Sequence, residues 1–382
     1  MLVKLMSKCE RGDVAVLKRT WAAVSTEAIA ANYRAVRRLV GEDCRVMAIV
    51  KADGYGHGAV PTAKALVEAG ADWLAVSNLC EAAELREAGL TQAILILGYT
   101  PPEEAAELAR LHITQTVSDA AYAEALEAEA AHAGVVLPVH IKIDTGMSRL
   151  GFVYQQHGAA IDEIAAACTL PHLQAEGLFT HFAFADDPDE AKTRHQFALF
   201  EEVTNRLREA GITVALRHCC NSAATLRFPE MHLDMVRPGL LLYGGVPDAS
   251  LSWEELTPAM SLKTVVAQVK TVPAGTAVSY GGMGVTTRET QLATVPIGYA
   301  DGLPRACSNT ATMLVNGERA TIVGRVCMDQ CVLDVTGLQV QPGDEVVVFG
   351  NGLPADALAE SAGTIVYEIL CRVGQRVPRV YL

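Results

Sequence analysis

The sequence of 382 residues lacks several features that define whole classes of protein. It holds no apolar run near the ~18–20 residues that a transmembrane helix needs, so we expect no membrane anchor. The first 18 residues carry basic side chains but no long apolar stretch, so we expect an N-terminal extension and no signal peptide. No low-complexity tract is present, and half of the residues are hydrophobic. These properties indicate a globular protein that can hold more than one core.

Positive charge and closely paired cysteines are also scarce. The 44 Asp and Glu residues outnumber the 31 Lys and Arg residues, for a formal net charge of −13. Nucleic-acid binding needs clustered basic side chains, so no nucleic-acid partner is expected. The ten cysteines form no C-x-x-C pair, and the spacing of Cys327 and Cys331 is weak support for a metal site. We expect no metal, and reduced, mostly buried thiols in a cytoplasmic protein.

The most informative stretch is CRVMAIVKADGYGHGA, residues 44–59. Its apolar run, 46–50, predicts a strand buried on both faces, and the run ends at Lys51. Glycines interleaved with Tyr55 predict a turn before a helix that begins near Ala59. A lysine amine beside a low-dielectric core can attack a carbonyl carbon and hold it as a Schiff base. The alternative is a lysine that only solvates the end of a strand.

Apolar runs alternate with helical patterns from about residue 25 to residue 245, which predicts right-handed βαβ units and a parallel sheet. About eight units in roughly 200 residues match an N-terminal (β/α)8 TIM barrel. A doubly wound open sheet is the alternative, but no G-x-G-x-x-G follows the first strand. The expected strands are 44–50, 73–77, 93–97, 113–117, 139–143, 174–180, 213–218 and 233–236, with helices that include 81–88, 120–133 and 191–210.

Near residue 250 the helical periodicity ends, and short strands separated by turn residues predict a C-terminal mainly-β domain. Asn316-Gly317 is a typical hairpin turn. We therefore expect an N-terminal extension (1–18), a barrel domain (19–250) and a C-terminal β domain (251–382). The expected strands of this last domain are 262–272, 292–295, 311–315, 320–326, 331–335 and 345–349, with one short helix near 356–362.

Polar side chains recur just after the strands of the expected barrel, where barrel enzymes place their chemistry. Loops after strands seven and eight commonly bind phosphate through backbone N–H groups, a role that Ser222, Gly239 and Leu240 fit. Taken singly, Asn221 and Ser222 could instead cap a helix, and Arg237 could pair with an acid at the rim. The full set is Lys51, Tyr55, Asp144, Arg149, His181, Asn221, Ser222, Arg237, Gly239 and Leu240.

Together with VKADGYGHG, the motifs HIKIDTGMSRLG, THFAFAD, NSAA, RPGLLLYG, SYGG, GYADGLPR, GRVCMDQ and YEILCRVGQRVPR resemble those of alanine racemases, from about Thr20 to Leu382. That family uses pyridoxal phosphate (PLP) to interconvert L- and D-alanine, and supplies D-alanine for peptidoglycan. The resemblance implies that Lys51 binds PLP covalently. The residues that would hold the PLP phosphate are Tyr55, Ser222, Gly239, Leu240 and Tyr367.

The resemblance also assigns roles around the cofactor ring. His181 would lie against the ring, and Arg149 would donate to its phenolic oxygen and help to bind the substrate carboxylate. Lys142 matches a lysine that carries a carbamate beside that arginine. Arg237 would face the pyridine nitrogen. Because an arginine is effectively always charged, it donates a hydrogen bond without releasing a proton, which disfavours transamination and decarboxylation.

Racemisation needs one acid–base group on each face of the substrate Cα. The resemblance assigns these roles to Lys51 and Tyr280, with Tyr280 supplied by the second subunit of a homodimer with shared active sites. Met328, also from the second subunit, would contribute a backbone N–H to the substrate carboxylate. Without the resemblance, Tyr280 reads as an ordinary surface tyrosine of a β domain. The residues that would line an access corridor for small amino acids are Asp186, Tyr299, Arg305, Arg325 and Tyr367.

Alternatives stay open at this point. A serine or broad-specificity racemase would share the scaffold, although Tyr367 crowds the side-chain region and favours alanine. A decarboxylase of similar architecture would carry an acid in place of Arg237. A non-catalytic PLP-binding protein would lack the β domain that carries Tyr280 and Met328. Ser148 stands where many family members have glycine, a change that we expect to be tolerated.

Overall fold

The computed structural model describes residues 19–155, 160–248, 251 and 253–382, so the expected extension 1–18 lies outside the described residues. These residues form two compact units. The barrel unit comprises 25–259. The β unit combines 260–382 with the short N-terminal segment 19–24, which the sequence analysis had placed with the barrel.

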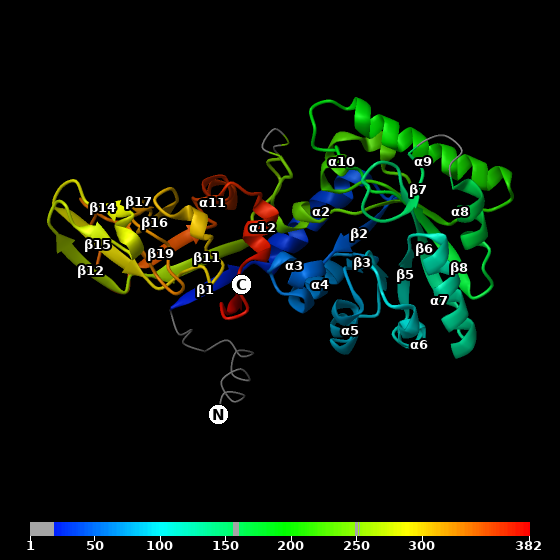
Figure 1. Cartoon of the computed structure of the whole chain (residues 1–382), viewed down its shortest axis with the longest axis horizontal. Coiled ribbons are helices and arrows are strands. Elements are labelled where there is room, and N and C mark those ends of the chain that lie inside the picture. The colour runs from blue at the N-terminus through cyan, green and yellow to red at the C-terminus, as the bar shows by residue number, and fades with distance from the viewer. Residues whose placement is uncertain (1–18, 156–159, 249–250, 252) are drawn as a thin grey trace. The chain divides into compact units, whose positions relative to one another are not determined.

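The barrel unit is built on parallel strands in the order β10-β2-β3-β4-β5-β6-β8-β9 (Figure 1). Backbone hydrogen bonds continue between the two end strands, because the N–H of Asp234 donates to the carbonyl of Arg217 and the N–H of Arg237 to that of Cys220. The expected (β/α)8 barrel is confirmed. Its strands are β2 (Arg45–Ile49), β3 (Trp73–Val76), β4 (Ala93–Ile96), β5 (Ile113–Val117), β6 (Leu137–Asp144), β8 (Leu173–Phe179), β9 (Leu216–His218) and β10 (Met235–Val236), with β7 (Phe152–Val153) paired to β6.

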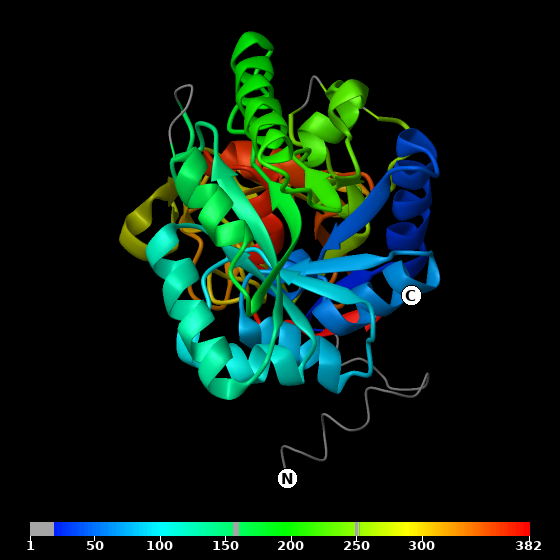
Figure 2. The ribbon, with the colours of Figure 1, turned by 90° about the vertical axis from the view of Figure 1, so that its right-hand side faces the viewer.

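Helices surround these strands (Figure 2). Every residue of β3 and β5 is buried, as expected for strands covered on both faces. Several helices begin at a side chain that accepts a backbone N–H, for example Ser25, Asn78 and Asp119. The helices are α2 (Thr26–Val40), α3 (Lys51–Tyr55), α4 (Ala59–Glu68), α5 (Leu79–Glu87), α6 (Ala105–Arg110), α7 (Ala120–Ala133), α8 (Ile161–Cys168), α9 (Ala191–Glu209) and α10 (Ser222–Arg227), with 3-10 turns η1 (Pro102–Glu104), η2 (Pro229–Met231) and η3 (Leu240–Tyr243).

The β unit is built on a sheet in the order β12-β15-β18-β17-β16-β19-β11-β1-β20, with a separate hairpin of β13 and β14. The predicted turn at Asn316-Gly317 is confirmed, because both residues have positive φ and join β16 to β17. The strands are β1 (Thr20–Val24), β11 (Met260–Val265), β12 (Gln268–Val272), β13 (Ala277–Val278), β14 (Gly284–Val285), β15 (Thr290–Val295), β16 (Thr312–Val315), β17 (Glu318–Ile322), β18 (Cys331–Asp334), β19 (Glu345–Phe349) and β20 (Arg379–Tyr381).

Helical elements of the β unit lie mainly near its C-terminal end. The predicted helix at 356–362 corresponds to α11 (Ala355–Ala362), and a second helix, α12 (Val366–Cys371), was not predicted. The expected strand 262–272 is two strands, β11 and β12, with different partners. Two 3-10 turns complete the unit, η4 (Tyr280–Gly282) and η5 (Arg305–Cys307).

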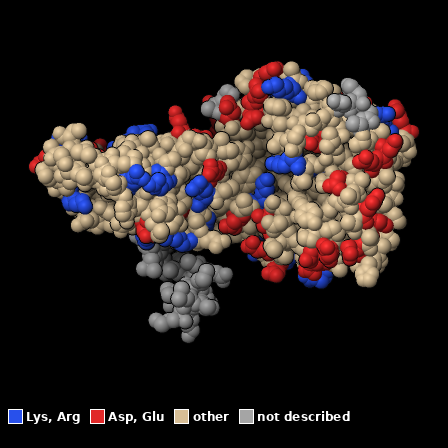
Figure 3. Space-filling view, viewed as in Figure 1, with Lys and Arg blue, Asp and Glu red and all other residues tan. Residues whose placement is uncertain are grey.

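Acidic side chains gather over the barrel unit on the face shown in Figure 3, in line with the formal net charge of −13. Among the residues that the structure describes, no helix is long and apolar enough to cross a bilayer. Within the same ranges, no group of three or more His, Cys, Asp or Glu side chains could hold a metal ion.

Candidate active site

Lys51 stands directly after β2, where the backbone makes an unusual turn. Ala52, Asp53, Gly54 and Tyr55 all have φ between 52° and 59°, a left-handed helical turn. Such geometry costs roughly 1–2 kcal/mol for each residue with a side chain. Two carboxylates hold it, because the Ala52 N–H donates to Glu81 Oε1 (2.8 Å) and the Ala59 N–H donates to Asp53 Oδ1 (2.7 Å). Strain maintained in this way is typical of functional sites.

The turn carries Tyr55 into the barrel unit, where it meets the residues expected to bind phosphate. The Tyr55 ring is buried and stacks on Tyr243 with centroids 4.9 Å apart, while the Tyr243 hydroxyl donates to the Ile49 carbonyl (2.9 Å). A Cβ on Gly239 would lie 2.6 Å from the Tyr55 hydroxyl oxygen, so only glycine fits there. The Gly239 N–H donates to Ser222 Oγ over 2.9 Å. The structure therefore brings Tyr55, Ser222 and Gly239 together.

Asn221 and Ser222 have separate roles, which resolves one alternative left open by the sequence. The Asn221 side chain accepts the N–H of Ala224 and caps α10. The Ser222 hydroxyl instead reaches the loop after β10 at Gly239. Leu240, the first residue of η3, is fully buried beside that loop. Ser222 is thus available to a site formed by the two loops.

Among the residues that the structure describes, no acid at the rim pairs with Arg237. It is buried, and one guanidinium nitrogen, Nη2, lies 2.7 Å from the Thr180 carbonyl oxygen, 3.1 Å from that of Cys219 and 3.4 Å from His181 Nδ1. The other, Nη1, lies 2.8 Å from His218 Nδ1. Burial lowers the pKa of Arg237 to about 10, which still leaves the guanidinium charged at neutral pH.

Two buried histidines, His218 and His140, extend the hydrogen bonding of Arg237 into the barrel. His218 Nε2 lies 2.8 Å from His140 Nδ1, and His140 Nε2 lies 3.6 Å from the Glu176 carboxylate. Since a guanidinium can only donate, His218 Nδ1 must accept, which places the hydrogen of His218 on Nε2 and makes it the donor to His140. Burial lowers the pKa of both histidines, so each is neutral near pH 7. The chain holds Arg237 in place as a hydrogen-bond donor.

Cationic side chains converge on one region at the C-terminal ends of β2, β6 and β10. Burial, followed by the charges of Arg149, Arg237 and Lys51, lowers the pKa of Lys142 to about 8, although Asp144 acts in the opposite sense. Burial and the same cations, with Lys142, hold the pKa of His181 well below its ordinary value. His181 is therefore neutral. The region can accommodate an anionic ligand, because several positive charges face it.

Arg149 is positioned by the loop after β6. Asp144 Oδ1 accepts the backbone N–H groups of Gly146, Met147 and Ser148 at 2.9, 2.9 and 3.0 Å, which fixes the turn that leads to Arg149. Ser148 has φ of 54°, a conformation that glycine adopts more readily. This geometry explains why glycine suits the position, and it shows that serine is accommodated.

The remaining expected site residues, apart from Asp186 in the barrel unit, belong to the β unit. Tyr280 opens η4 and is 73% exposed, and Met328 is also exposed. The N–H groups of Tyr299 and Ala300 donate to the carbonyls of Cys327 and Met328, so the Tyr299 and Met328 loops are joined. Ser279 Oγ donates to the Arg325 carbonyl (2.8 Å). Arg305 lies in η5 and Tyr367 in α12.

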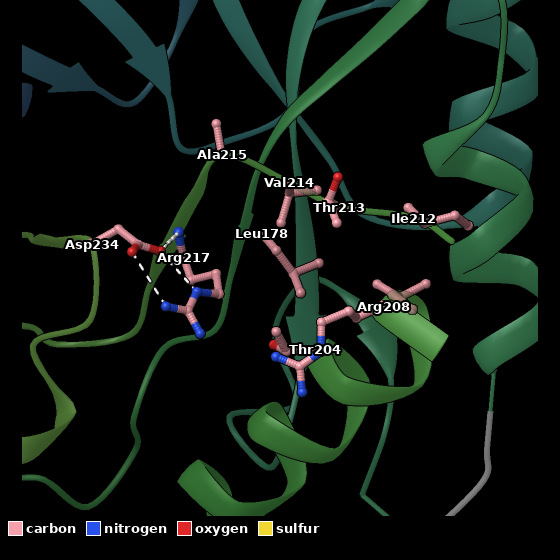
Figure 4. Close-up of a pocket in the computed structure, with 10 residues that line it drawn as sticks. Leu178, Thr204, Arg208, Ile212, Thr213, Val214, Ala215, Arg217 and Asp234 are labelled. Atoms are coloured by element: carbon pink, nitrogen blue, oxygen red, sulfur yellow. Dashed lines mark hydrogen bonds and ion pairs between the residues drawn. The ribbon is translucent and has the colours of Figure 1, made fainter. Parts of the chain in front are cut away.

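A separate cavity of about 290 Å³ lies beside the N-terminal ends of β9 and β10 (Figure 4). It lies beside the C-terminal end of α9 and the residues that lead into β9. Arg217 and Asp234 face one another there and form an ion pair over 2.8 Å. None of the expected site residues lines it. The lining residues are Leu178, Thr204, Leu207, Arg208, Ile212, Thr213, Val214, Ala215, Arg217 and Asp234.

The sequence alone did not single out His140, His218 or Tyr243, although His140 and Tyr243 each lie in a motif quoted for the resemblance. His140 was detectable as a polar residue between the apolar Val139 and Ile141 of a buried strand, since a buried polar group needs a partner. His218 was not, because it follows the polar Arg217 in a strand of three residues. Tyr243 follows three leucines, so nothing in the sequence indicated that its role differs from that of a buried apolar residue. Their partners lie far along the chain, so their roles follow only from the structure.

The fold and the site define a class of enzyme that combines a parallel (β/α)8 barrel with a mainly-β unit and carries a lysine directly after the first barrel strand. Family models described as "Alanine racemase, N-terminal domain" and "Alanine racemase, C-terminal domain" match residues 24–247 and 259–381. The chain belongs to the alanine racemase family.

Individual relatives cover nearly the whole chain. An alanine racemase of Desulforamulus reducens is 49% identical over 366 residues, which covers 95% of this chain and 98% of the relative. One of Desulfovibrio desulfuricans is 48% identical over 365 residues, with the same coverage. The solved alanine racemase of Streptomyces coelicolor aligns with a TM-score of 0.92 at 40% identity, covering 97% of this chain and 100% of that one. The likeness therefore extends over both units.

Proposed function

We propose that this chain is a PLP-dependent alanine racemase that interconverts L- and D-alanine and supplies D-alanine for peptidoglycan. The observation that carries the proposal is the set of groups at the C-terminal face of the barrel. A lysine on a strained turn, a glycine-lined cradle and a cluster of cations meet there around a neutral histidine. A cytoplasmic location, expected from the cysteine content, belongs to the same proposal.

The residues present fit PLP. Because residue 239 has no Cβ, the Tyr55 hydroxyl can lie against the Gly239 backbone, next to the Ser222 hydroxyl. These hydroxyl and N–H groups would hold the phosphate, and Leu240 and Tyr367 complete the expected set. His181 would lie against the ring, and Arg149 would donate to the phenolic oxygen. When bound, PLP supplies an electrophilic carbon for the lysine amine and a ring that acidifies the α-hydrogen of an amino acid.

Arg237 favours racemisation over other reactions of this cofactor. Its guanidinium stays charged and is held by His218 and two backbone carbonyls, and within the described ranges no carboxylate is among its hydrogen-bond partners. It would donate to the pyridine nitrogen without releasing a proton, so electron withdrawal by the ring stays limited. This argues against a decarboxylase.

Proton transfer would need two groups on opposite faces of the substrate Cα. Lys51 would serve one face and Tyr280 of a second subunit the other, with Arg149 and the Met328 N–H binding the substrate carboxylate. We therefore propose a homodimer with shared active sites. Small amino acids would reach the site past Asp186, Tyr299, Arg305, Arg325 and Tyr367. The β unit that carries Tyr280 argues against a non-catalytic PLP-binding protein.

Lys142 would carry a carbamate that compensates the charge of its cationic neighbours. With a pKa of about 8, its amine is partly neutral near physiological pH and can attack CO2, forming the N–C bond and releasing a proton. We expect protein incubated with carbon-13 bicarbonate to show a carbamate NMR signal that weakens as the pH falls through about 8. Lys142→Met should lose the signal and Lys192→Met, at an exposed lysine, should keep it. Absence of the signal above pH 8 would contradict the assignment.

The activity is tested with purified protein, PLP and a panel of amino acids in deuterated water, following Cα deuterium and chirality together. We expect alanine to exchange and lose chirality, with little turnover of serine. Fast turnover of serine would favour the broad-specificity racemase on the same scaffold. Bound PLP without exchange of any amino acid would contradict the proposed function and favour the non-catalytic alternative.

A further inference from the structure

Ser279, the residue before Tyr280, has a backbone conformation that glycine normally occupies. Its φ is 63° and its ψ is −176°, a region in which a Cβ is strained. The two residues after Tyr280 are glycines with φ of 69° and 56°. They have no side chains with which to hold a conformation. Side chains therefore hold this loop at its two ends, through Ser279 before Tyr280 and through Asn309, whose amide donates to the Met283 carbonyl (3.2 Å) after the glycines.

The Ser279 hydroxyl makes such contacts with the segment that leads to Met328. It donates its hydrogen to the Arg325 carbonyl over 2.8 Å, and its oxygen lies 3.3 Å from Cys327 Sγ, which can donate in turn. The backbones are close, because a Cβ on Gly324 would lie 2.6 Å from the Val278 carbonyl oxygen and 2.8 Å from Ser279 Cβ. One hydroxyl thus joins the Tyr280 loop to the loop of Met328.

The direction of Tyr280 depends on this contact. The Tyr280 side chain is 73% exposed within its own chain, so packing does little to fix it. The dihedral angles of residue 279 set the direction of the backbone from which Tyr280 projects, and the hydroxyl keeps those angles in a region they would otherwise leave.

We infer that Ser279 is a positioning residue that holds Tyr280 in register with the Met328 loop. The inference rests on the proposed function of Tyr280 as one of two proton-transferring groups. Ser279 would contact no reacting atom in the proposed mechanism. It acts through the backbone, and its loss should impair the proton transfer that Tyr280 performs while leaving the one performed by Lys51.

The test compares Ser279→Ala with Ser279→Gly, full-length and loaded with PLP. Alanine keeps the strained Cβ and removes the hydroxyl, whereas glycine removes both. We expect the racemisation kcat of Ser279→Ala to fall by about 10- to 100-fold, since a displacement near 1 Å costs about that much. Exchange of Cα hydrogen for deuterium without inversion should persist for one enantiomer, and the KM for alanine should change little. Ser279→Gly should lose racemisation as well, because glycine tolerates the conformation but does not hold it.

The control is Ser361→Ala, which removes a similar 2.8 Å bond from a serine hydroxyl to a backbone carbonyl in the same unit. It should racemise alanine as the unmodified protein does. Tyr280→Phe is the reference, and normal racemisation by it would reject the role of Tyr280 itself. A second readout does not need activity. Amide hydrogen exchange of residues 279–284 should accelerate in both Ser279 variants and not in Ser361→Ala. The inference would be overturned if Ser279→Ala racemised alanine normally, or if amide hydrogen exchange of residues 279–284 did not change. It would also be overturned if Cα deuterium exchange and inversion were lost to the same extent.

Discussion

Replacing Lys51 with alanine is expected to lower the racemisation kcat by about 10³-fold or more, because the substitution would remove both the proposed covalent anchor of PLP and one of the two proposed proton-transferring groups. Lys51→Arg should fail equally. It keeps the positive charge, but a guanidinium does not supply a neutral amine at neutral pH. The measurement is racemisation of alanine by PLP-loaded protein, together with borohydride reduction and mass spectrometry to locate the covalently bound cofactor.

The matched control is Lys64→Ala, at an exposed lysine on α4 of the same unit. It should retain full activity and the trapped cofactor on Lys51. Cofactor trapped in Lys51→Ala at another lysine, with substantial racemisation, would contradict the assignment. Retained activity in Lys51→Arg would show that position 51 contributes charge alone.

The barrel was predictable because its strands are short apolar runs between helical patterns. The predicted strand 113–117 and helix 120–133 match β5 and α7. Local patterns fix these elements, since a strand buried on both faces must be apolar and a helix needs caps and periodicity. The fold places the C-terminal ends of all barrel strands on one face, which is why the residues that follow the strands could be proposed for the site.

The sheet to which β1 belongs could not be predicted from a local pattern. Residues 20–24 were placed with the barrel and not predicted as a strand, and their assignment to the β unit depends on pairing with β11, where Ala22 is opposite Leu262. Such pairing joins residues about 240 positions apart in the chain, and the hydrophobic periodicity of either segment does not reveal its partner. The break between β11 and β12 is similar, because one continuous apolar pattern serves two strands with different partners.

The sequence allowed the candidate site to be proposed as a set of residues, and only the structure gives that set a geometry. The motifs named Lys51 and Arg237, but not the left-handed turn after Lys51 or the histidines behind Arg237. The sequence left open whether Asn221 and Ser222 only cap a helix, and their observed partners separate the cap, Asn221, from the loop contact, Ser222. Side-chain direction and long-range contacts decide these roles.

Replacing Asp301 with alanine is expected to destabilise the β unit by about 3 kcal/mol, the lower end of the cost of removing one partner from a buried ion pair. The Asp301 side chain is fully buried and accepts from Arg376 (2.7 Å), Arg19 (3.0 Å) and the Gly298 N–H (2.9 Å). The lower end applies because both arginines are partly exposed and regain water. Chemical denaturation at pH 7 measures the loss. Glu345→Gln, in an exposed pair with Lys263, should cost about 1 kcal/mol or less.

The pH dependence of that stability has a defined sign. Burial would raise the pKa of the Asp301 carboxyl, but the hydrogen bonds from Arg376, Arg19 and Gly298 outweigh it and hold the pKa below its ordinary value of 3.8. A carboxyl with a lowered folded pKa stabilises the fold above its unfolded pKa, and the contribution is lost as the pH falls through the folded pKa. The stability difference between the unmodified protein and Asp301→Ala should therefore be constant near neutral pH and shrink below 3.8. A difference that grows on acidification would mean that Asp301 is protonated in the fold, and the ion pairs with Arg19 and Arg376 would then not be its stabilising contacts.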